Sequence, residues 1–206
     1  MKKLSLTLLL VALLFACTSE DDPEITSKIN GHEYVDLGLP SGIKWATCNI
    51  GASSPFDYGN YYAWGETKPK TTYTEANCQT YNKNLDNISN NAKYDVAYAN
   101  WGGSWRLPSK KEWEELCLEC AWTWTTQGEY YGYKVTGANG NSIFLPAAGY
   151  RIGASLLNVG GHGLYWSSTL YKNDASSACN LFFNSSSRNV DSNSRFCGQS
   201  VRPVSE

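Results

Sequence analysis

The last forty residues of the chain, 165–204, constrain its fold most, because short apolar runs alternate there with Ser, Asn, Asp and aromatic residues. Runs of this length predict short strands joined by turns. Between residues 176 and 184 the side chains alternate, so that one face of a strand carries Cys179, Leu181 and Phe183. The other face carries Ala178, Asn180, Phe182 and Asn184.

If the face with Leu181 and Phe183 lies on the core, Phe182 stands in solvent among small polar residues. An exposed aromatic ring among Ser and Asn is typical of a protein contact surface. A solvated strand edge with one isolated exposed Phe is the alternative, since single apolar residues are common on protein surfaces.

The amino terminus has the features of an export signal, which occupies residues 1–16. Lys2 and Lys3 precede a run of twelve apolar or small residues, 4–15, which is too short to span a bilayer as a helix. The sequence around Cys17 resembles a bacterial lipobox, which implies that the Cys17 thiol is lipidated and anchors the chain to a membrane. An ordinary secretory signal with an incidental cysteine is the alternative.

A flexible acidic tether is expected at residues 17–29, since residues 18–24 are polar, mostly acidic and without a hydrophobic residue. This segment resembles the acidic signal that directs Bacteroidetes lipoproteins to the outer face of the outer membrane. The resemblance implies a protein anchored in the outer membrane and displayed on the cell exterior.

The folded domain is expected at residues 30–206. Strands are predicted at 32–37, 43–50, 121–126, 130–136 and 142–145, the last two joined by the hairpin signal Asn139-Gly140. Helices are predicted at 94–101 and after Ser109, where Ser109 and Glu112 form a capping box. Residues 153–163 are expected to be a glycine-rich loop, and residues 66–91 show no clear period. Helices and strands together predict an α+β domain.

Composition excludes several functions. The formal net charge of −2 gives no electrostatic reason to expect a nucleic acid partner. Two histidines and a helical Cys117-x-x-Cys120 without a second ligand pair give no basis for a metal centre. No phosphate-binding glycine motif follows a strand. We therefore expect neither a cofactor nor an enzymatic activity.

Motifs along nearly the whole domain resemble the Fibrobacter succinogenes major paralogous domain, a family of Bacteroidetes lipoproteins. They are YVDLGLPSGIKWATCNIGA, YYAWGE, NWGGSWRLPSKKEWEEL, FLPAAGYR, YWSST and GQSVRPV. The family is related to formylglycine-generating-enzyme-like C-type lectin folds. The resemblance implies a C-type lectin-like fold, in which two helices pack on a small, twisted, mostly antiparallel sheet with long loops.

Residues 165–200 also resemble the variable region of a diversity-generating retroelement. Such elements rewrite Asn codons at the end of a C-type lectin-like gene, so that Ser, Asp, Tyr, Phe or Cys replaces Asn. Phe182 and the pair Phe196-Cys197 resemble diversified Asn positions. An undiversified relative with a naturally polar surface is the alternative, and the flanking DNA distinguishes the two.

Six cysteines remain besides Cys17, and an even number in an exported protein suggests disulfides. They are Cys48, Cys78, Cys117, Cys120, Cys179 and Cys197. Three disulfides and free, buried thiols are both compatible with the sequence.

The sequence therefore predicts a surface lipoprotein that binds an external ligand, a protein rather than a carbohydrate, through its carboxy-terminal strands and loops. An undiversified surface or structural lipoprotein and a formylglycine-generating-like oxidase are the alternatives, and the oxidase would need Cys179 and Cys197. The predicted contacts are Tyr171, Asn173, Asp174, Ser176, Asn180, Phe182, Asn184, Asn189, Asp191, Asn193, Phe196 and Cys197.

Overall fold

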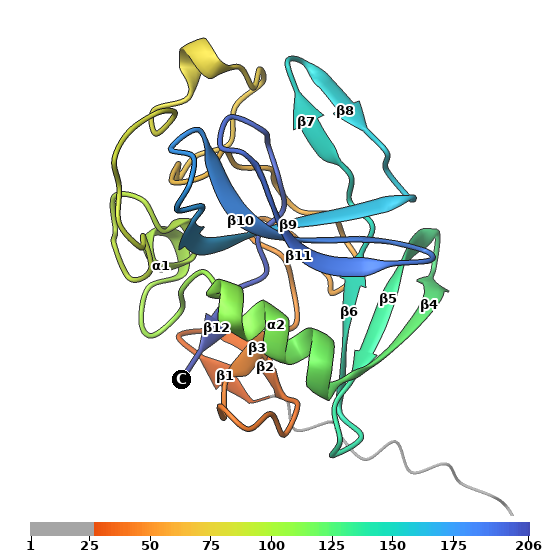
Figure 1. Ribbon diagram of the computed structural model, residues 1–206. Helices are drawn as coiled ribbons and strands as arrows, with labels where there is room; N and C mark the ends of the chain where they lie inside the picture. The colour runs from red at the N-terminus through yellow and green to blue at the C-terminus, as the bar shows by residue number, and fades with distance from the viewer. Residues whose placement is uncertain (1–26) are drawn as a thin grey trace, which may run out of the picture.

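The computed structural model describes residues 27–206, and the predicted signal peptide, Cys17 and most of the tether lie outside them. The described part has an α+β fold with two α-helices, α1 (Val96–Trp101) and α2 (Lys110–Glu119) (Figure 1). A single 3-10 helix, Glu75–Asn77, interrupts the otherwise irregular segment 66–91.

Both α-helices begin at the residue types that favour helix starts. Ser109 caps α2, accepting from the Glu112 N–H, while the Glu112 carboxylate accepts from the Ser109 N–H at 2.6 Å. This confirms the predicted capping box. Asp95 caps α1, accepting from the backbone N–H groups of Ala97 and Tyr98.

The strands form four small sheets rather than the single small sheet expected, and all pairs of named strands are antiparallel. The first sheet contains β1 (Lys28–Ile29), β2 (His32–Asp36), β3 (Lys44–Ala46) and β12 (Val204–Ser205). The second contains β4 (Ala121–Gln127), β5 (Tyr130–Thr136) and β6 (Ser142–Pro146). The third, in the order β11-β10-β9, contains β9 (His162–Leu170), β10 (Ser177–Asn184) and β11 (Arg188–Ser194).

The fourth sheet corrects the expectation of a loop over residues 153–163. This stretch contains β8 (Ser155–Leu157), which pairs with β7 (Tyr150–Ile152), and also the start of β9. The β7–β8 hairpin projects from the rest of the chain at the top of Figure 1.

Two large hydrophobic clusters lie on opposite faces of the β9–β11 sheet. The first packs Trp113 and Leu116 of α2 against Leu181 and Phe183 of β10, and α2 lies along this face (Figure 1). The second contains Trp64, Trp166 and Ala178. The sheet is therefore a central layer that is covered, at least in part, on both sides.

The six cysteines of the described chain are free, in line with the alternative of free, buried thiols. Cys78, Cys120, Cys179 and Cys197 are buried, and Cys48 and Cys117 are half-buried. Non-covalent packing therefore holds the described fold together.

Candidate ligand-binding face

The face of the β9–β11 sheet that points away from α2 was predicted to bind the ligand. Its register pairs Phe182 of β10 with Asn189 of β11 and with Leu164 of β9. Leu181 and Phe183 are fully buried in the first cluster, as the alternation predicts. Phe182 consequently lies on the opposite face, where it is half-buried rather than fully in solvent.

The centre of this face is covered, which corrects the prediction for Asn180. Asn180 is only 2% exposed, and its Nδ2 donates to Oε1 of Gln199 at 3.2 Å. Ser200 lies beside β9 in a parallel bridge with Tyr165, because the Ser200 N–H donates to the Leu164 carbonyl and the Trp166 N–H donates to the Ser200 carbonyl. This brings the side chain of the preceding Gln199 against Asn180. Asn180 and the fully buried Ala178 are therefore interior residues.

The prediction for the Phe196-Cys197 pair is also corrected. Cys197 is 2% exposed, and burial raises its pKa to about 11. Phe196 is half-buried and packs edge-on against Tyr81, with 5.7 Å between ring centroids. Cys197 therefore does not reach the surface, and Phe196 packs between interior clusters instead of standing free as an anchor.

The remaining predicted contacts separate into two patches at opposite ends of the sheet. The register places Leu170 opposite Ala178 at one end of the β9–β10 pair and His162 opposite Asn184 at the other. Because a strand rises about 3.3 Å per residue, the six residues from Ala178 to Asn184 separate these ends by roughly 20 Å. The predicted aromatic residues Tyr171 and Phe182 therefore do not converge on one site.

The first patch, called the turn patch here, comprises Tyr171, Asn173, Asp174 and Ser176. Tyr171 is exposed, and Asp174 organises the turn by accepting from the Ser176 N–H and from the hydroxyls of Ser176 and Ser177. The Ser176 hydrogen bonds lower the pKa of Asp174, so its carboxylate is charged and engaged within the turn. Asn193 of β11, half-buried, lies opposite Ala178 at the same end of the sheet.

The second patch, called the hairpin patch here, is built around Phe182. The ring of His162 meets Phe182 in an edge-to-face contact, with 5.3 Å between ring centroids. Nδ1 of His162 lies 3.2 Å from Nδ2 of Asn158, and the His162 N–H donates to the Asn158 carbonyl. Asn158 follows directly on β8, so these contacts link Phe182 of β10 to the end of the β7–β8 hairpin.

The sequence prediction missed the apolar part of the hairpin patch. Four side chains in this stretch are large, apolar and exposed, and none was singled out: Ile152, Leu156, Leu157 and Val159. The β7–β8 register places Ile152 and Leu157 on one face of the hairpin and Leu156, opposite Arg151, on the other. A signal was present, since no charged residue occurs between Arg151 and His162 although four large aliphatic residues do. Glycines on both sides made this stretch resemble a loop.

Polar predicted contacts border the hairpin patch. Asn189 and Asp191 of β11 are exposed, and Asn184 is half-buried. The Asn184 side-chain oxygen accepts from the backbone N–H groups of Ser186 and Ser187, which fixes the β10–β11 turn. This arrangement keeps the turn ordered beside the apolar side chains.

The described residues contain no group of three or more His, Cys, Asp or Glu side chains placed to hold a metal ion. Cys179 is buried like Cys197, and burial raises the pKa of its thiol as well. Within residues 27–206 no helix is both long enough and apolar enough to span a membrane. No protein-family model, no curated protein and no solved structure matches this chain.

Proposed function

We propose that this protein binds an external protein ligand through the hairpin patch. The observation that carries the proposal is the contact series Phe182–His162–Asn158, which links an aromatic ring on β10 to the end of the β7–β8 hairpin. Ile152 and Leu157 are exposed on one face of this hairpin. Contiguous exposed apolar surface with a polar border is typical of protein interaction sites. The neighbouring Asn side chains supply adaptable hydrogen-bonding groups.

The fold is part of this proposal. Two helices beside small antiparallel sheets with long connections support a C-type lectin-like domain of the kind that the motif resemblance implies. The lipobox resemblance at Cys17 supports a lipid anchor, and the acidic residues after it support display outside the outer membrane. Metabolic labelling with a radioactive fatty acid, with Cys17→Ala as the control, tests the anchor.

Diversification by a retroelement is a proposal for the exposed positions only. Exposed residues such as Tyr171, Asn173, Asn189 and Asp191 offer side chains that vary without disturbing the interior. Asn180 and Cys197 are buried, and Val190 packs against the first cluster. Sequencing the flanking DNA tests the idea. A template repeat mismatched only at template adenines, beside a reverse transcriptase gene, supports it, and the absence of both contradicts it.

The ligand-binding proposal is tested with a photo-crosslinking amino acid placed at Val159 on intact cells. The cross-linked partner is identified by mass spectrometry and purified, and its affinity is measured by titration calorimetry. We expect Phe182→Ala to weaken binding at least tenfold, as is usual for a central aromatic contact.

Leu118 provides the matched control, because it is an exposed apolar residue on α2, outside the patch, and is 80% exposed. We expect Leu118→Ala to bind like the unaltered protein. Equal affinities for Phe182→Ala and Leu118→Ala contradict the proposal.

A further inference from the structure

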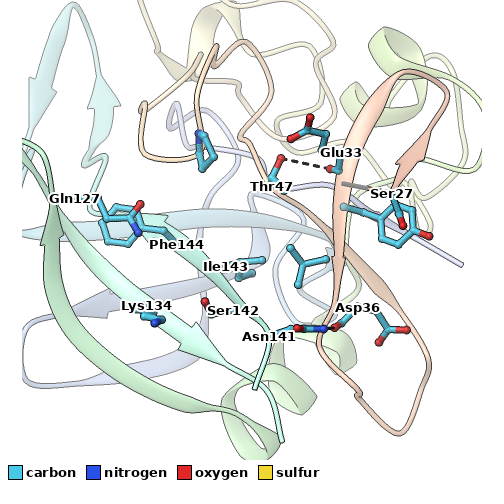
Figure 2. A pocket seen from close by; sticks show the side chains of 13 residues that line it. Ser27, Glu33, Asp36, Thr47, Gln127, Lys134, Asn141, Ser142, Ile143 and Phe144 are labelled. Carbon is cyan, nitrogen blue, oxygen red and sulfur yellow. Dashed lines mark hydrogen bonds between the residues drawn. The ribbon is translucent and has the colours of Figure 1, made fainter. Parts of the chain in front are cut away.

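The polar groups around the cleft between β2 and β6 are largely bound within the chain. This cleft has a volume of about 650 Å³, with Glu33 and Asp36 on one side and Lys134 on the other (Figure 2). Lys28 pairs with Glu33 at 3.4 Å, and Nδ2 of Asn141 donates to the Asp36 carbonyl at 2.8 Å. The lining therefore leaves few groups free to select a ligand.

A second, smaller cleft lies beside β7 and is called the Arg151 cleft here. It is lined by residues 59–61, by residues 69–73 and by the Arg151 side chain of β7. Its volume is about 290 Å³. Small-molecule sites typically begin at roughly 300 Å³, so this cleft suits one small functional group rather than a large ligand.

Arg151 gives this cleft a positive charge whose donors are free. Among residues 27–206 its guanidinium takes part in no salt bridge and no hydrogen bond. It lies over the ring of Tyr61, with 5.2 Å between Cζ and the ring centroid. This contact holds the guanidinium by its face, so the N–H donors along its edge remain available to a ligand.

Lys70, the other cation in the lining, is already satisfied. Its Nζ lies 3.0 Å from Oε2 of Glu66 and donates to two oxygens of Asn77, at 3.0 and 3.1 Å. These contacts use the three N–H donors of an ammonium group. The described lining contains no Asp or Glu, and burial raises the pKa of Tyr61 to about 12, so its phenol is neutral. The charge of Arg151 is therefore not compensated within the cleft.

Hydrogen bonds between distant segments fix the walls of the Arg151 cleft. The Arg151 N–H donates to the Gly198 carbonyl at 2.8 Å, and the Gly198 N–H donates to the Arg151 carbonyl at 2.9 Å. The Tyr61 hydroxyl donates to the Ala148 carbonyl at 2.6 Å, and the Tyr73 hydroxyl donates to the Tyr61 carbonyl at 2.6 Å. The cation and the aromatic wall beneath it are thus positioned in advance, which reduces the entropy cost of binding.

We propose that the Arg151 cleft binds a carboxylate group, from a free small acid or from the carboxyl terminus of a peptide. The donors of an arginine form a planar fork that matches the two oxygens of a carboxylate. One uncompensated cation balances the single charge of a carboxylate, whereas a phosphate group carries about −1.5 to −2 at pH 7. Arg151 lies on the hairpin face opposite to Ile152 and Leu157, so the proposal does not depend on the hairpin patch.

The first test uses the unaltered protein and pairs of probes that differ only in the carboxylate. Benzoate is compared with benzamide, and acetyl-dialanine with its carboxy-terminal amide, by titration followed at the Arg151 Nε–H signal in the NMR spectrum. We expect an acid to bind at least tenfold more tightly than its amide, and the tighter acid identifies the source of the carboxylate. Equal binding of acid and amide in both pairs overturns the proposal. So does inorganic phosphate that binds more tightly than either acid.

Variants of Arg151 test whether its fork holds the carboxylate. For the tighter acid we expect Arg151→Met to weaken binding at least tenfold and Arg151→Lys at least threefold, since an ammonium group cannot form the two parallel hydrogen bonds. Lys111→Met, at an exposed position on α2 outside the cleft, is the matched control and should change affinity less than twofold. Equal affinities for Arg151→Met and Lys111→Met overturn the proposal. If Arg151→Met unfolds, the comparison of acid and amide on the unaltered protein decides.

Discussion

Arg202 fixes the carboxy-terminal segment to distant parts of the chain. Its side chain is fully buried, and among residues 27–206 it forms no salt bridge. Instead it donates to oxygens of Asn49, Ala46, Thr47, Pro55 and Phe144. Burial lowers the pKa of Arg202, but an arginine side chain remains protonated in proteins. One planar cation thus connects β3, the loop after it and β6.

We predict that Arg202→Met destabilises the protein by at least about 3 kcal/mol, because several buried acceptors lose a charged donor together. Arg202→Lys is expected to lose nearly as much, since one ammonium group cannot reach five acceptors in a plane. Urea unfolding followed by tryptophan fluorescence measures both. Lys111→Met, at an exposed position on α2, is the control and should change stability by less than about 0.5 kcal/mol.

The wrong prediction for Asn180 can be explained by the contacts of this one residue. Asn180 was assigned to the surface because it is polar and alternates with Leu181. Its Nδ2 donates to Gln199, nineteen residues further along the chain, and no local pattern predicts that contact. Phe182 was placed on the correct face. Side chains alternate between the two faces of a strand, so the neighbouring residues alone show which face Phe182 occupies.

At the scale of single elements, α2 was predictable because its signals are local. Ser109 and Glu112 are three residues apart, and the apolar residues Trp113 and Leu116 follow at helical spacing. The β5–β6 hairpin was predictable for the same reason, from Asn139-Gly140. The strands β7 and β8 were not, because β7 and the residue after it are held by distant partners: Arg151 pairs with Gly198, and Gly153 with Tyr73.

The start of α2 makes a prediction about pH. Arg106 binds the Glu112 carboxylate through both terminal nitrogens, at 2.9 and 2.7 Å, while the Ser109 N–H donates to the same carboxylate. Burial alone would raise the pKa of Glu112, but these hydrogen bonds hold it below the ordinary value of 4.5. The charged carboxylate therefore stabilises the fold above pH 4.5, and this contribution is lost as the pH falls through the folded-state pKa.

We predict that Glu112→Gln costs about 1.5–3 kcal/mol of stability at pH 7, because a buried charge-assisted pair is broken. The difference from the unaltered protein should shrink as the pH falls below 4.5. Urea unfolding at a series of pH values measures it. Glu119→Gln, at an exposed position near the end of α2, should show no comparable pH-dependent gap. A gap that stays constant down to pH 3 would argue against the ion pair.

At the scale of the whole molecule, the two clusters on either side of the β9–β11 sheet join the beginning of the described chain to its end. Val204 of β12 lies in the first cluster with Trp45 of β3, and Val201 lies in the second. Within residues 27–206 no disulfide links the beginning of the described chain to its end. The free energy of folding therefore depends on burial and on hydrogen bonds such as those of Arg202.

This leads to a prediction that distinguishes the two cysteine alternatives left open by the sequence. Burial raises the pKa of Cys117, Cys120 and Cys197 to about 11, so their thiols are neutral at pH 7 and react slowly with oxidants and alkylating agents. We expect a reductant to leave the melting temperature unchanged. We also expect the unfolded, unreduced protein to take up iodoacetamide at all six cysteines from 48 to 197, as counted by mass spectrometry. A disulfide in the exported protein would typically contribute 2–4 kcal/mol, so reduction would then lower the melting temperature by several degrees.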